Sequence, residues 1–432
     1  MQARTPALLV VGLDFDMRMW DLSLVGDSTL ISRRDTVLLF LTRITRLFAY
    51  GFVSIILALY LAALGFSEGR IGLLLTLTLL GDAVISLWIT ISADRIGRRK
   101  MLLVGTGLMI IAGIVFLITD SYVVLVPAAI IGVISPSGKE IGPFLSIEQA
   151  ALSQLVPDQR RTRIFAWYNL AGSFATASGA LFGGWLAQNL RDSGFTAVEA
   201  YRAVLSGYVV CGILIGTFFL CLTRAIESAT TADQPARFGL HRSKPVVMKL
   251  SALFAMDAFA GGFVIQSILA FWLHVRFGME EAQIGSFFFA ANLLAGVSAL
   301  TAARLASRIG LVKTMVFTHV PSNILLFLVP VMPGPVSAVS LLLLRYSISQ
   351  MDVPTRQSYT MAVVSPDERS AASGVTTIAR SVGASLSPAL SGILMSSPLP
   401  MGMPFFMAGG LKIVYDLLLY RSFKQIKPAE EI

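Results

Sequence analysis

The chain has 432 residues, of which 55 % are hydrophobic and only 14 % are charged, and its mean hydropathy is +0.75. This composition excludes an ordinary soluble multidomain protein and predicts an all-α integral membrane protein. The net charge of +9 alone could suggest a nucleic-acid partner, but the basic residues gather between apolar segments. We therefore interpret them as topology determinants and expect no nucleic-acid site. The two cysteines, Cys211 and Cys221, have a spacing that suits neither a metal site nor a disulfide framework.

Apolar windows divide the chain into twelve predicted membrane spans. Each has the roughly 20 residues that cross a hydrocarbon core about 30 Å thick. The predicted spans are residues 36–64, 70–92, 101–119, 121–150, 164–188, 201–223, 248–275, 283–305, 312–331, 335–356, 370–396 and 404–422. Tails are expected at 1–35 and 423–432. The polar stretch 224–247 reads as a cytoplasmic linker, so we expect two six-helix bundles, at 36–223 and 248–422.

The distribution of basic residues predicts the orientation in the membrane. Only four of the 34 lysines and arginines lie in the loops on the side opposite to the tails, and these are Arg70, Arg191, Arg202 and Arg276. Because cytoplasmic loops carry an excess of Lys and Arg, both termini are predicted to be cytoplasmic. We expect a multi-pass protein of the cell membrane.

An internal repeat indicates that the two bundles are pseudo-symmetric. Ile71-Gly72 and Arg95-Ile96-Gly97 recur without a gap as Ile284-Gly285 and Arg308-Ile309-Gly310. In a second register, Pro157-Asp158-Gln159-Arg160 matches Pro366-Asp367-Glu368-Arg369, and Gly183 matches Gly392. Matches at several places in one order favour duplication, and transporters are commonly built from such repeats with the substrate between them.

The stretch Ser135–Gln149 interrupts the fourth predicted span with prolines, glycines and charges. Backbone freed by Pro or Gly in hydrocarbon must find partners in protein or in a water-filled cavity. The repeat places it opposite the charged and interrupted tenth span, 335–356. Paired broken segments at corresponding places indicate a transporter's binding region. We therefore interpret Ser135–Gln149 as a hinge or gate as much as a binding site.

The octapeptide Ala93–Lys100, A-D-R-I-G-R-R-K, resembles the signature loop of the major facilitator superfamily. The family usually has glycine four residues before the aspartate, where this chain has Thr90. The resemblance implies twelve helices, with the first, fourth, seventh and tenth lining a central cavity, and alternating access between the halves. It also implies a cytoplasmic latch formed by Asp94, Arg95, Gly97, Arg98 and Arg99, and Glu148 is expected at the same cytoplasmic gate. The alternative is that these arginines only set topology.

The fifth span ends in G-A-L-F-G-G, residues Gly179 to Gly184, which resembles the G-P-x-x-G-G element of the family's proton-coupled exporters. Ala180 replaces the proline, whereas Pro388 stands near the matching place in the eleventh span. The resemblance favours an exporter. The alternative is that Gly179, Gly183, Gly184 and Pro388 serve helix packing, because small residues let helices approach closely.

Ionisable residues deep within the spans are the candidate site. Charges in the membrane interior are costly and commonly mark pathways. We expect Arg46, Lys139, Arg345 and Arg380 to bind anionic or strongly polar substrate groups, and Glu140, Asp257 or Asp82 to carry a coupling proton. The alternative is that these groups pair off and hold helices together, as Arg46 with Asp82 or Arg380 with Glu140. Lys412 and Asp416, one helical turn apart, are expected to satisfy each other.

These features predict a proton-coupled secondary transporter that exports a small organic compound by alternating access. Uptake of an organic anion by proton symport is the close alternative, supported by the buried arginines, and a non-transporting membrane sensor is a third. No nucleophile motif, metal-ligand cluster or phosphate loop indicates an enzyme, a cofactor or a metal site. The expected partners are a small-molecule substrate, protons and the lipid bilayer, and we expect a monomer.

Overall fold

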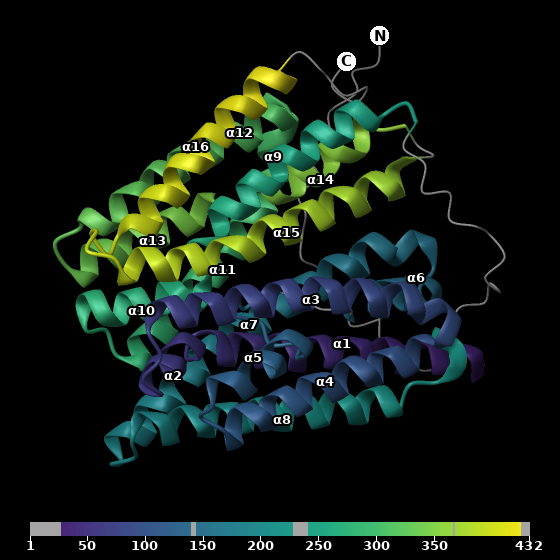
Figure 1. Ribbon diagram of the computed structural model, residues 1–432. Helices are drawn as coiled ribbons and strands as arrows, with labels where there is room; N and C mark the ends of the chain where they lie inside the picture. Colours follow the sequence, from purple (N-terminus) through teal and green to yellow (C-terminus); the bar gives the residue numbers. More distant parts are fainter. Residues whose placement is uncertain (1–26, 140–143, 228–240, 366–367, 425–432) are drawn as a thin grey trace, which may run out of the picture.

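The computed structural model describes residues 27–139, 144–227, 241–365 and 368–424, and all regular structure within these ranges is helical (Figure 1). The first half contains α1 (Asp27–Ser54), α2 (Leu57–Ala63), α3 (Glu68–Ile96), α4 (Arg98–Ile118), α5 (Tyr122–Ile131), α6 (Phe144–Leu155), α7 (Asp158–Asp192), α8 (Ala197–Leu220) and η2 (Arg224–Ile226). The second half contains α9 (Lys244–Gly262), α10 (Gln266–Phe277), α11 (Glu281–Ile309), α12 (Leu311–Leu328), η3 (Val329–Val331), α13 (Pro335–Ile348), α14 (Asp352–Ala362), α15 (Arg369–Ser396) and α16 (Met403–Phe423).

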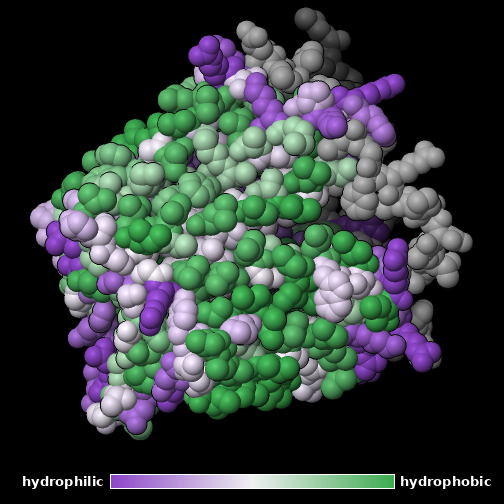
Figure 2. Space-filling view, viewed as in Figure 1, coloured by the Kyte–Doolittle hydropathy of each residue, from purple (hydrophilic) through white to green (hydrophobic). Residues whose placement is uncertain are grey.

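Joined end to end, these helices give the twelve predicted crossings. Within the described ranges, nine segments are long and apolar enough to span a membrane on their own. The remaining crossings are α7 and the interrupted pairs α5–α6 and α13–α14. Large apolar side chains such as Val84, Ile118 and Val336 are exposed on the outer surface, which is largely hydrophobic in Figure 2. Such a surface suits lipid, and the prediction of an all-helical membrane fold is confirmed.

The two halves form two bundles that lie one above the other in Figure 1, α1–α8 below and α9–α16 above. We name the two ends of the molecule by their turns: the Gly97 end carries the α3–α4 and α11–α12 turns, and the Gly65 end carries the α2–α3 and α7–α8 turns. The bundles diverge toward the Gly97 end, where Figure 2 shows a recess with hydrophilic side chains inside it. This recess is called the central cleft below.

Four crossings are interrupted, and they are the first, fourth, seventh and tenth. The interruptions of the first, fourth and seventh meet between the bundles. Ser267 donates its backbone N–H and its hydroxyl to the Pro136 carbonyl, at 3.0 and 2.7 Å, and its hydroxyl also lies 2.6 Å from the Ser54 carbonyl. Gly138 has φ +64°, and a Cβ there would lie 2.9 Å from the Gln266 side-chain oxygen. Backbone groups released by the broken helices are thus satisfied across the bundle interface, as the membrane interior requires.

Glycines close the bundles together near the Gly65 end along two seams. In the α3–α15 seam, Gly72 and Gly392 are so close that a Cβ on Gly72 would lie 3.0 Å from the Gly392 Cα. In the α7–α11 seam, a Cβ on Gly285 would lie 3.2 Å from the Gly184 Cα. The two seams have the same kind of contact, a glycine of one bundle against a glycine of the other. Small residues of this kind let the helix backbones touch.

The same contacts fix the register of the repeat. A Cβ on Gly72 would meet the Pro388 carbonyl at 2.3 Å, and one on Gly285 would meet the Ala180 carbonyl at 2.7 Å. Pro388 therefore corresponds to Ala180, and Gly392 to Gly184. This is one residue from the sequence match of Gly392 with Gly183.

Candidate functional site

Asp257, in the second half of α9, is the centre of a buried ionic cluster in the second bundle. Its carboxylate lies 2.5 Å from Lys412 Nζ, 3.1 Å from Arg380 Nη1 and 3.2 Å from Arg356 Nη1. Arg356 also pairs with Asp352 at 2.8 Å. These groups come from α9, α14, α15 and α16, so one carboxylate ties four helices together. Arg380 is the most open member, because its side chain is 33 % exposed whereas the others are below 10 %.

A second carboxylate, Asp416, lies behind this cluster. His319 Nδ1 is 2.8 Å from Asp416, and the Asn323 amide donates to the same carboxylate at 2.9 Å. His319 Nε2 is 3.9 Å from Asp257, so the imidazole lies between the two carboxylates. Lys412 therefore pairs with Asp257, and the sequence expectation that Lys412 and Asp416 satisfy each other is wrong. The spacing of one helical turn placed them on one face, but the neighbouring helices offer closer partners.

The first bundle has a closed ion pair. Arg46 donates from Nη1 and Nη2 to the two oxygens of Glu148, at 2.7 and 2.6 Å, and both side chains have no solvent exposure. Thr42 donates to the same carboxylate at 2.9 Å, and the Tyr168 hydroxyl also donates to it. Bidentate Arg–carboxylate geometry is the strongest form of this contact. Arg46 and Glu148 thus lie inside one bundle, whereas the sequence placed Arg46 at the substrate and Glu148 at a gate.

Lys139 brings the two bundles into electrostatic contact. It stands in the segment between α5 and α6, its side chain is exposed, and it interacts through charge with Arg380, Lys412, Arg345 and Asp352 of the second bundle. Three of the four predicted substrate-binding residues are therefore connected through Lys139, which lies within electrostatic range of both Arg345 and Arg380. Arg345 lies over the Tyr346 ring at 5.3 Å, and its Nε is buried without a partner among the described residues.

Asp82 is the second predicted proton carrier that the structure describes. Asp82 is 7 % exposed in α3, where Ser86 donates to it at 3.5 Å and the Tyr208 ring is within electrostatic range. Glu140 lies outside the described residues. Of the three predicted carriers, the structure therefore describes Asp257 and Asp82, and it places Asp257 within the cationic cluster.

The signature loop is fixed within the first bundle. Arg98 pairs with Asp94 at 2.9 Å and donates to the Gln154 side chain at 3.0 Å and the Ile226 carbonyl at 3.2 Å. Gly97, with φ +117°, makes the turn. Glu227 then accepts the backbone N–H of Arg98 at 2.6 Å, an acid at a helix N-terminus.

The two other arginines of this loop differ in their surroundings. Arg99 donates to the Phe219 carbonyl at 3.1 Å, whereas Arg95 is exposed. All of these contacts stay within the first bundle. Glu227 was not among the predicted residues, because its place depends on the linker folding back onto α4.

The glycines of α7 lie at helix contacts. A Cβ on Gly179 would meet the Phe48 carbonyl at 2.1 Å, and one on Gly183 would meet the Phe52 carbonyl at 2.4 Å. Both contacts are with α1. Gly184 instead faces α11, as described for the α7–α11 seam. These glycines allow α7 to pack closely against α1 of its own bundle and against α11 of the second bundle.

Comparison with known proteins agrees with this architecture. A family model described as the Major Facilitator Superfamily matches residues 39–388. An uncharacterised membrane protein of Saccharomyces cerevisiae is 29 % identical over 423 residues, which cover 90 % of this chain and 94 % of the yeast protein. The nucleoside transporter NupG has a similar structure, with a TM-score of 0.70 and 16 % identity over 91 % of this chain and 99 % of that one.

The human organic anion transporter MFSD10 is also similar, with a TM-score of 0.60 and 16 % identity over 90 % of this chain and 99 % of its own. Identities at this level establish the fold alone. The family model spans most of the chain and agrees with the signature loop, the twelve crossings and the two related bundles. The chain therefore belongs to the Major Facilitator Superfamily.

Proposed function

We propose that this protein is a secondary transporter that moves a small organic anion together with protons, by alternating access to the central cleft. The observation that carries the proposal is the excess of cations between the bundles. Lys139 of the first bundle lies within electrostatic range of Arg345 and Arg380 of the second, and Arg380 is one-third exposed. Guanidinium groups offer planar donors that suit carboxylate, phosphate or sulfonate groups. Among solved structures of this fold, MFSD10 is described as an organic anion transporter.

Asp257 supplies the link to protons. Its carboxylate oxygens already form ion pairs with Arg380 Nη1 at 3.1 Å and Lys412 Nζ at 2.5 Å. An incoming anion competes with Asp257 for these cations. An Asp257 that loses them keeps Arg356, which it shares with Asp352, and is left buried with less positive charge around it. A proton on Asp257 removes that penalty and at the same time frees the cations for the anion. Anion and proton binding therefore favour each other, and such coupling is reciprocal.

Positive coupling favours symport over exchange. When the proton gradient points into the cell, symport gives uptake of the anion. The glycine-rich fifth span favoured export, but Gly179, Gly183 and Gly184 are all engaged in helix packing. Export of a small organic compound by proton exchange is the alternative, and it requires that proton and substrate compete.

The test is transport by the purified protein in proteoliposomes, using a panel of radiolabelled organic anions and an imposed pH gradient. We expect an anion to accumulate on the alkaline side, and the accumulation to collapse when a proton ionophore is added. Asp257→Asn should abolish proton-driven accumulation while anion exchange between equal pH values continues. Arg380→Gln should raise the KM for the anion by about tenfold or more, because a charge-assisted hydrogen bond is worth about 1.5–3 kcal/mol.

Asp192→Asn and Arg276→Gln are the matched controls, since both side chains are exposed and lie at the Gly65 end, opposite the opening of the cleft. Both should transport like the parent. Proton-driven accumulation that survives Asp257→Asn contradicts the assignment of Asp257. Accumulation on the acidic side identifies proton exchange instead, and saturable binding without net flux identifies a sensor.

A further inference from the structure

His319 lies between two buried carboxylates that belong to different helices. Its side chain, in the middle of α12, is 4 % exposed. Nδ1 is 2.8 Å from Asp416 Oδ1 of α16, and Nε2 is 3.9 Å from Asp257 Oδ1 of α9. The first distance is that of a hydrogen bond, whereas the second is within ion-pair range but too long for a hydrogen bond.

Asp416 determines which ring nitrogen carries the proton of the neutral imidazole. Its Oδ1 faces Nδ1, and its Oδ2 accepts the Asn323 amide at 2.9 Å. A carboxylate that accepts on both oxygens requires a proton on Nδ1, so Nε2 of the neutral ring keeps its lone pair. The Tyr415 ring stands edge-on to the imidazole, with 6.0 Å between the ring centroids. Nε2 is therefore the nitrogen that can take a further proton, and its carboxylate neighbour is Asp257.

The buried charges around the imidazole balance when the ring is neutral. Three carboxylates and three cations make up this cluster, and they are Asp257, Asp352, Asp416, Arg356, Arg380 and Lys412. Arg345 of α13 lies beyond ion-pair distance of Asp257 and acts on it through charge alone. The charged side chains of α11, which also contacts α12, lie near the two ends of that helix.

A bound anion upsets this balance. In the proposed function it draws Arg380 and Lys412 away from Asp257, so the two carboxylates beside the imidazole lose positive charge. A proton on Nε2 makes the imidazole positive and replaces that charge between Asp257 and Asp416. Unperturbed histidine changes its charge between about pH 5 and pH 8, whereas unperturbed aspartate does so near about pH 4. The imidazole therefore suits this exchange better than either carboxylate.

We propose that His319 holds the coupling proton on Nε2, as the counter-charge of Asp257 when the substrate is bound, and that Asp416 positions the imidazole for it. The inference rests on the proposed function, because it assigns the link between anion and proton to one atom. Hydronium in the water of the cleft supplies the proton, an N–H bond forms at Nε2, and a water molecule remains. Release on the other side of the membrane reverses the step.

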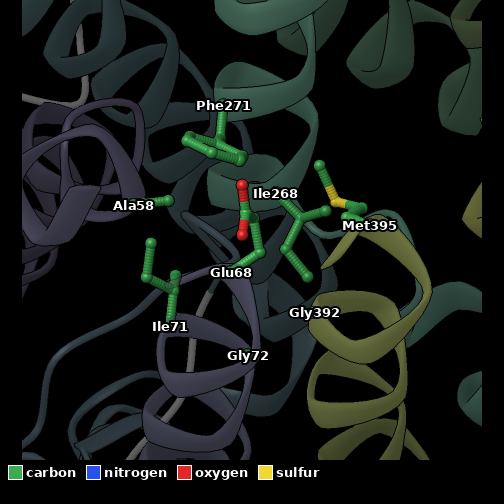
Figure 3. A pocket seen from close by; sticks show the side chains of 8 residues that line it. All are labelled: Ala58, Glu68, Ile71, Gly72, Ile268, Phe271, Gly392 and Met395. Carbon is green, nitrogen blue, oxygen red and sulfur yellow. The ribbon is translucent and has the colours of Figure 1, made fainter. Parts of the chain in front are cut away.

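In this conformation the proton comes from the central cleft. Arg380, one-third exposed, is the most open member of the cluster. At the Gly65 end, Figure 3 shows how closely α3 and α15 approach each other beside Glu68. The cavity at that seam measures about 10 Å³, room for about one water molecule, so it holds no file of waters that could carry a proton inward.

The test follows the protonation of His319 by nuclear magnetic resonance, without any substrate. The chain has three histidines, His241, His274 and His319. Isotope labelling of the histidine ring nitrogens in protein held in lipid nanodiscs thus gives three sets of signals, and the set that His319→Gln removes belongs to His319. His241→Gln and His274→Gln identify the other two sets if His319→Gln fails to fold. The chemical shifts report which nitrogen carries a proton at each pH.

We expect the proton on Nδ1 above neutral pH and a second proton on Nε2 as the pH falls. Arg380→Gln removes one cation from Asp257, as a bound anion does, and should raise the proton-binding constant of the imidazole by about threefold or more. Asp416→Asn should lower that constant by about tenfold or more, because a charge-assisted hydrogen bond is lost. Asp192→Asn, an exposed acid at the Gly65 end, should leave it unchanged.

An imidazole that stays neutral down to about pH 4, or charged up to about pH 9, overturns the assignment of the proton to His319. A constant that Arg380→Gln leaves unchanged or lowers overturns the link to the anion. A proton found on Nε2 and not on Nδ1 above neutral pH overturns the role of Asp416. Because no substrate is used, a chain whose imidazole responds as expected but moves no anion would refute the proposed function and leave the protonation site standing.

Discussion

Glu148 and Asp257 are both buried carboxylates, but their surroundings give them different roles. Glu148 accepts four hydrogen bonds from Arg46, Thr42 and Tyr168 and has no exposed surface. A closed set of this kind has no vacant cation for a substrate. Asp257 instead shares Arg380, a side chain that is one-third exposed, with the space between the bundles. The first arrangement suits a structural pair and the second suits a site whose partners can change.

The structural role of Glu148 predicts a large loss of stability when its charge is removed. Glu148→Gln removes the charge of the carboxylate that binds the buried Arg46 guanidinium through two hydrogen bonds. Breaking a buried pair in this way costs about 3–5 kcal/mol. We expect a clear drop in the thermal unfolding midpoint of the protein in detergent. Tyr168→Phe removes one neutral donor and should cost only about 1 kcal/mol. Equal midpoints for the two variants would show that the Arg46–Glu148 pair contributes little.

At the scale of elements, hydropathy predicts the twelve crossings because each one is a local property of about 20 residues. The interruptions at Ser135–Gln149 and in the tenth span were also predicted, since proline and glycine break helices locally. The interruption between α1 and α2 was not predicted. No proline stands there, and the Ser54 carbonyl is satisfied by Ser267, 213 residues further along the chain. Such a break depends on the other bundle.

For the candidate site, the sequence indicated individual residues but not the pairs that they form. Arg345, Arg380 and Asp257 were proposed because charges are rare in the membrane interior, and Lys139 because its span is broken by proline and glycine. Their pairing was not recognised, because partners such as Arg356 and Asp257 are separated by 99 residues. The role of His319 was missed for the same reason: its two carboxylate neighbours come from α9 and α16, and nothing in the local sequence connects them.

The start of α9 depends on an acid from the turn before α15. Glu368 accepts the backbone N–H groups of Arg242 at 2.9 Å and Ser243 at 2.8 Å, and that of His241 as well. Hydrogen bonds from the Ser243 side chain and from these backbone groups lower the pKa of Glu368 from its ordinary 4.5 to about 2. The contacts tie two elements that 125 residues separate.

This lowered pKa predicts a pH-dependent contribution to stability. A carboxyl whose folded pKa is depressed stabilises the fold fully above its unfolded pKa, and the contribution is lost as the pH falls through the folded value. Glu368→Gln should therefore unfold at a lower temperature than the parent at neutral pH. The difference should shrink between about pH 4.5 and pH 2. Thermal unfolding in detergent across this range measures it, with Asp192→Asn as control. A difference that grows as the pH falls would contradict the assignment.

For the whole molecule, the conformation and the distribution of basic residues together indicate the side of the membrane to which the central cleft opens. The bundles touch along both seams near the Gly65 end and diverge at the Gly97 end (Figure 1). The Gly97 end also carries the basic turns that contain Arg98 and Arg308, whereas the opposite loops have few basic residues. If the basic end is cytoplasmic, the structure is the state in which the central cleft opens to the cytoplasm.

The orientation is tested by two single cysteines in a chain that carries Cys211→Ala and Cys221→Ser. Ser193→Cys follows α7 at the Gly65 end, and Ser307→Cys stands in the last turn of α11 at the Gly97 end; both serines are exposed. A membrane-impermeant maleimide should label Ser193→Cys in intact cells and Ser307→Cys only in inverted vesicles. This outcome follows from the excess of Lys and Arg at the Gly97 end, which opposes translocation of those loops. Labelling of Ser307→Cys in intact cells would reverse the orientation and place the open side of the cleft outside the cell.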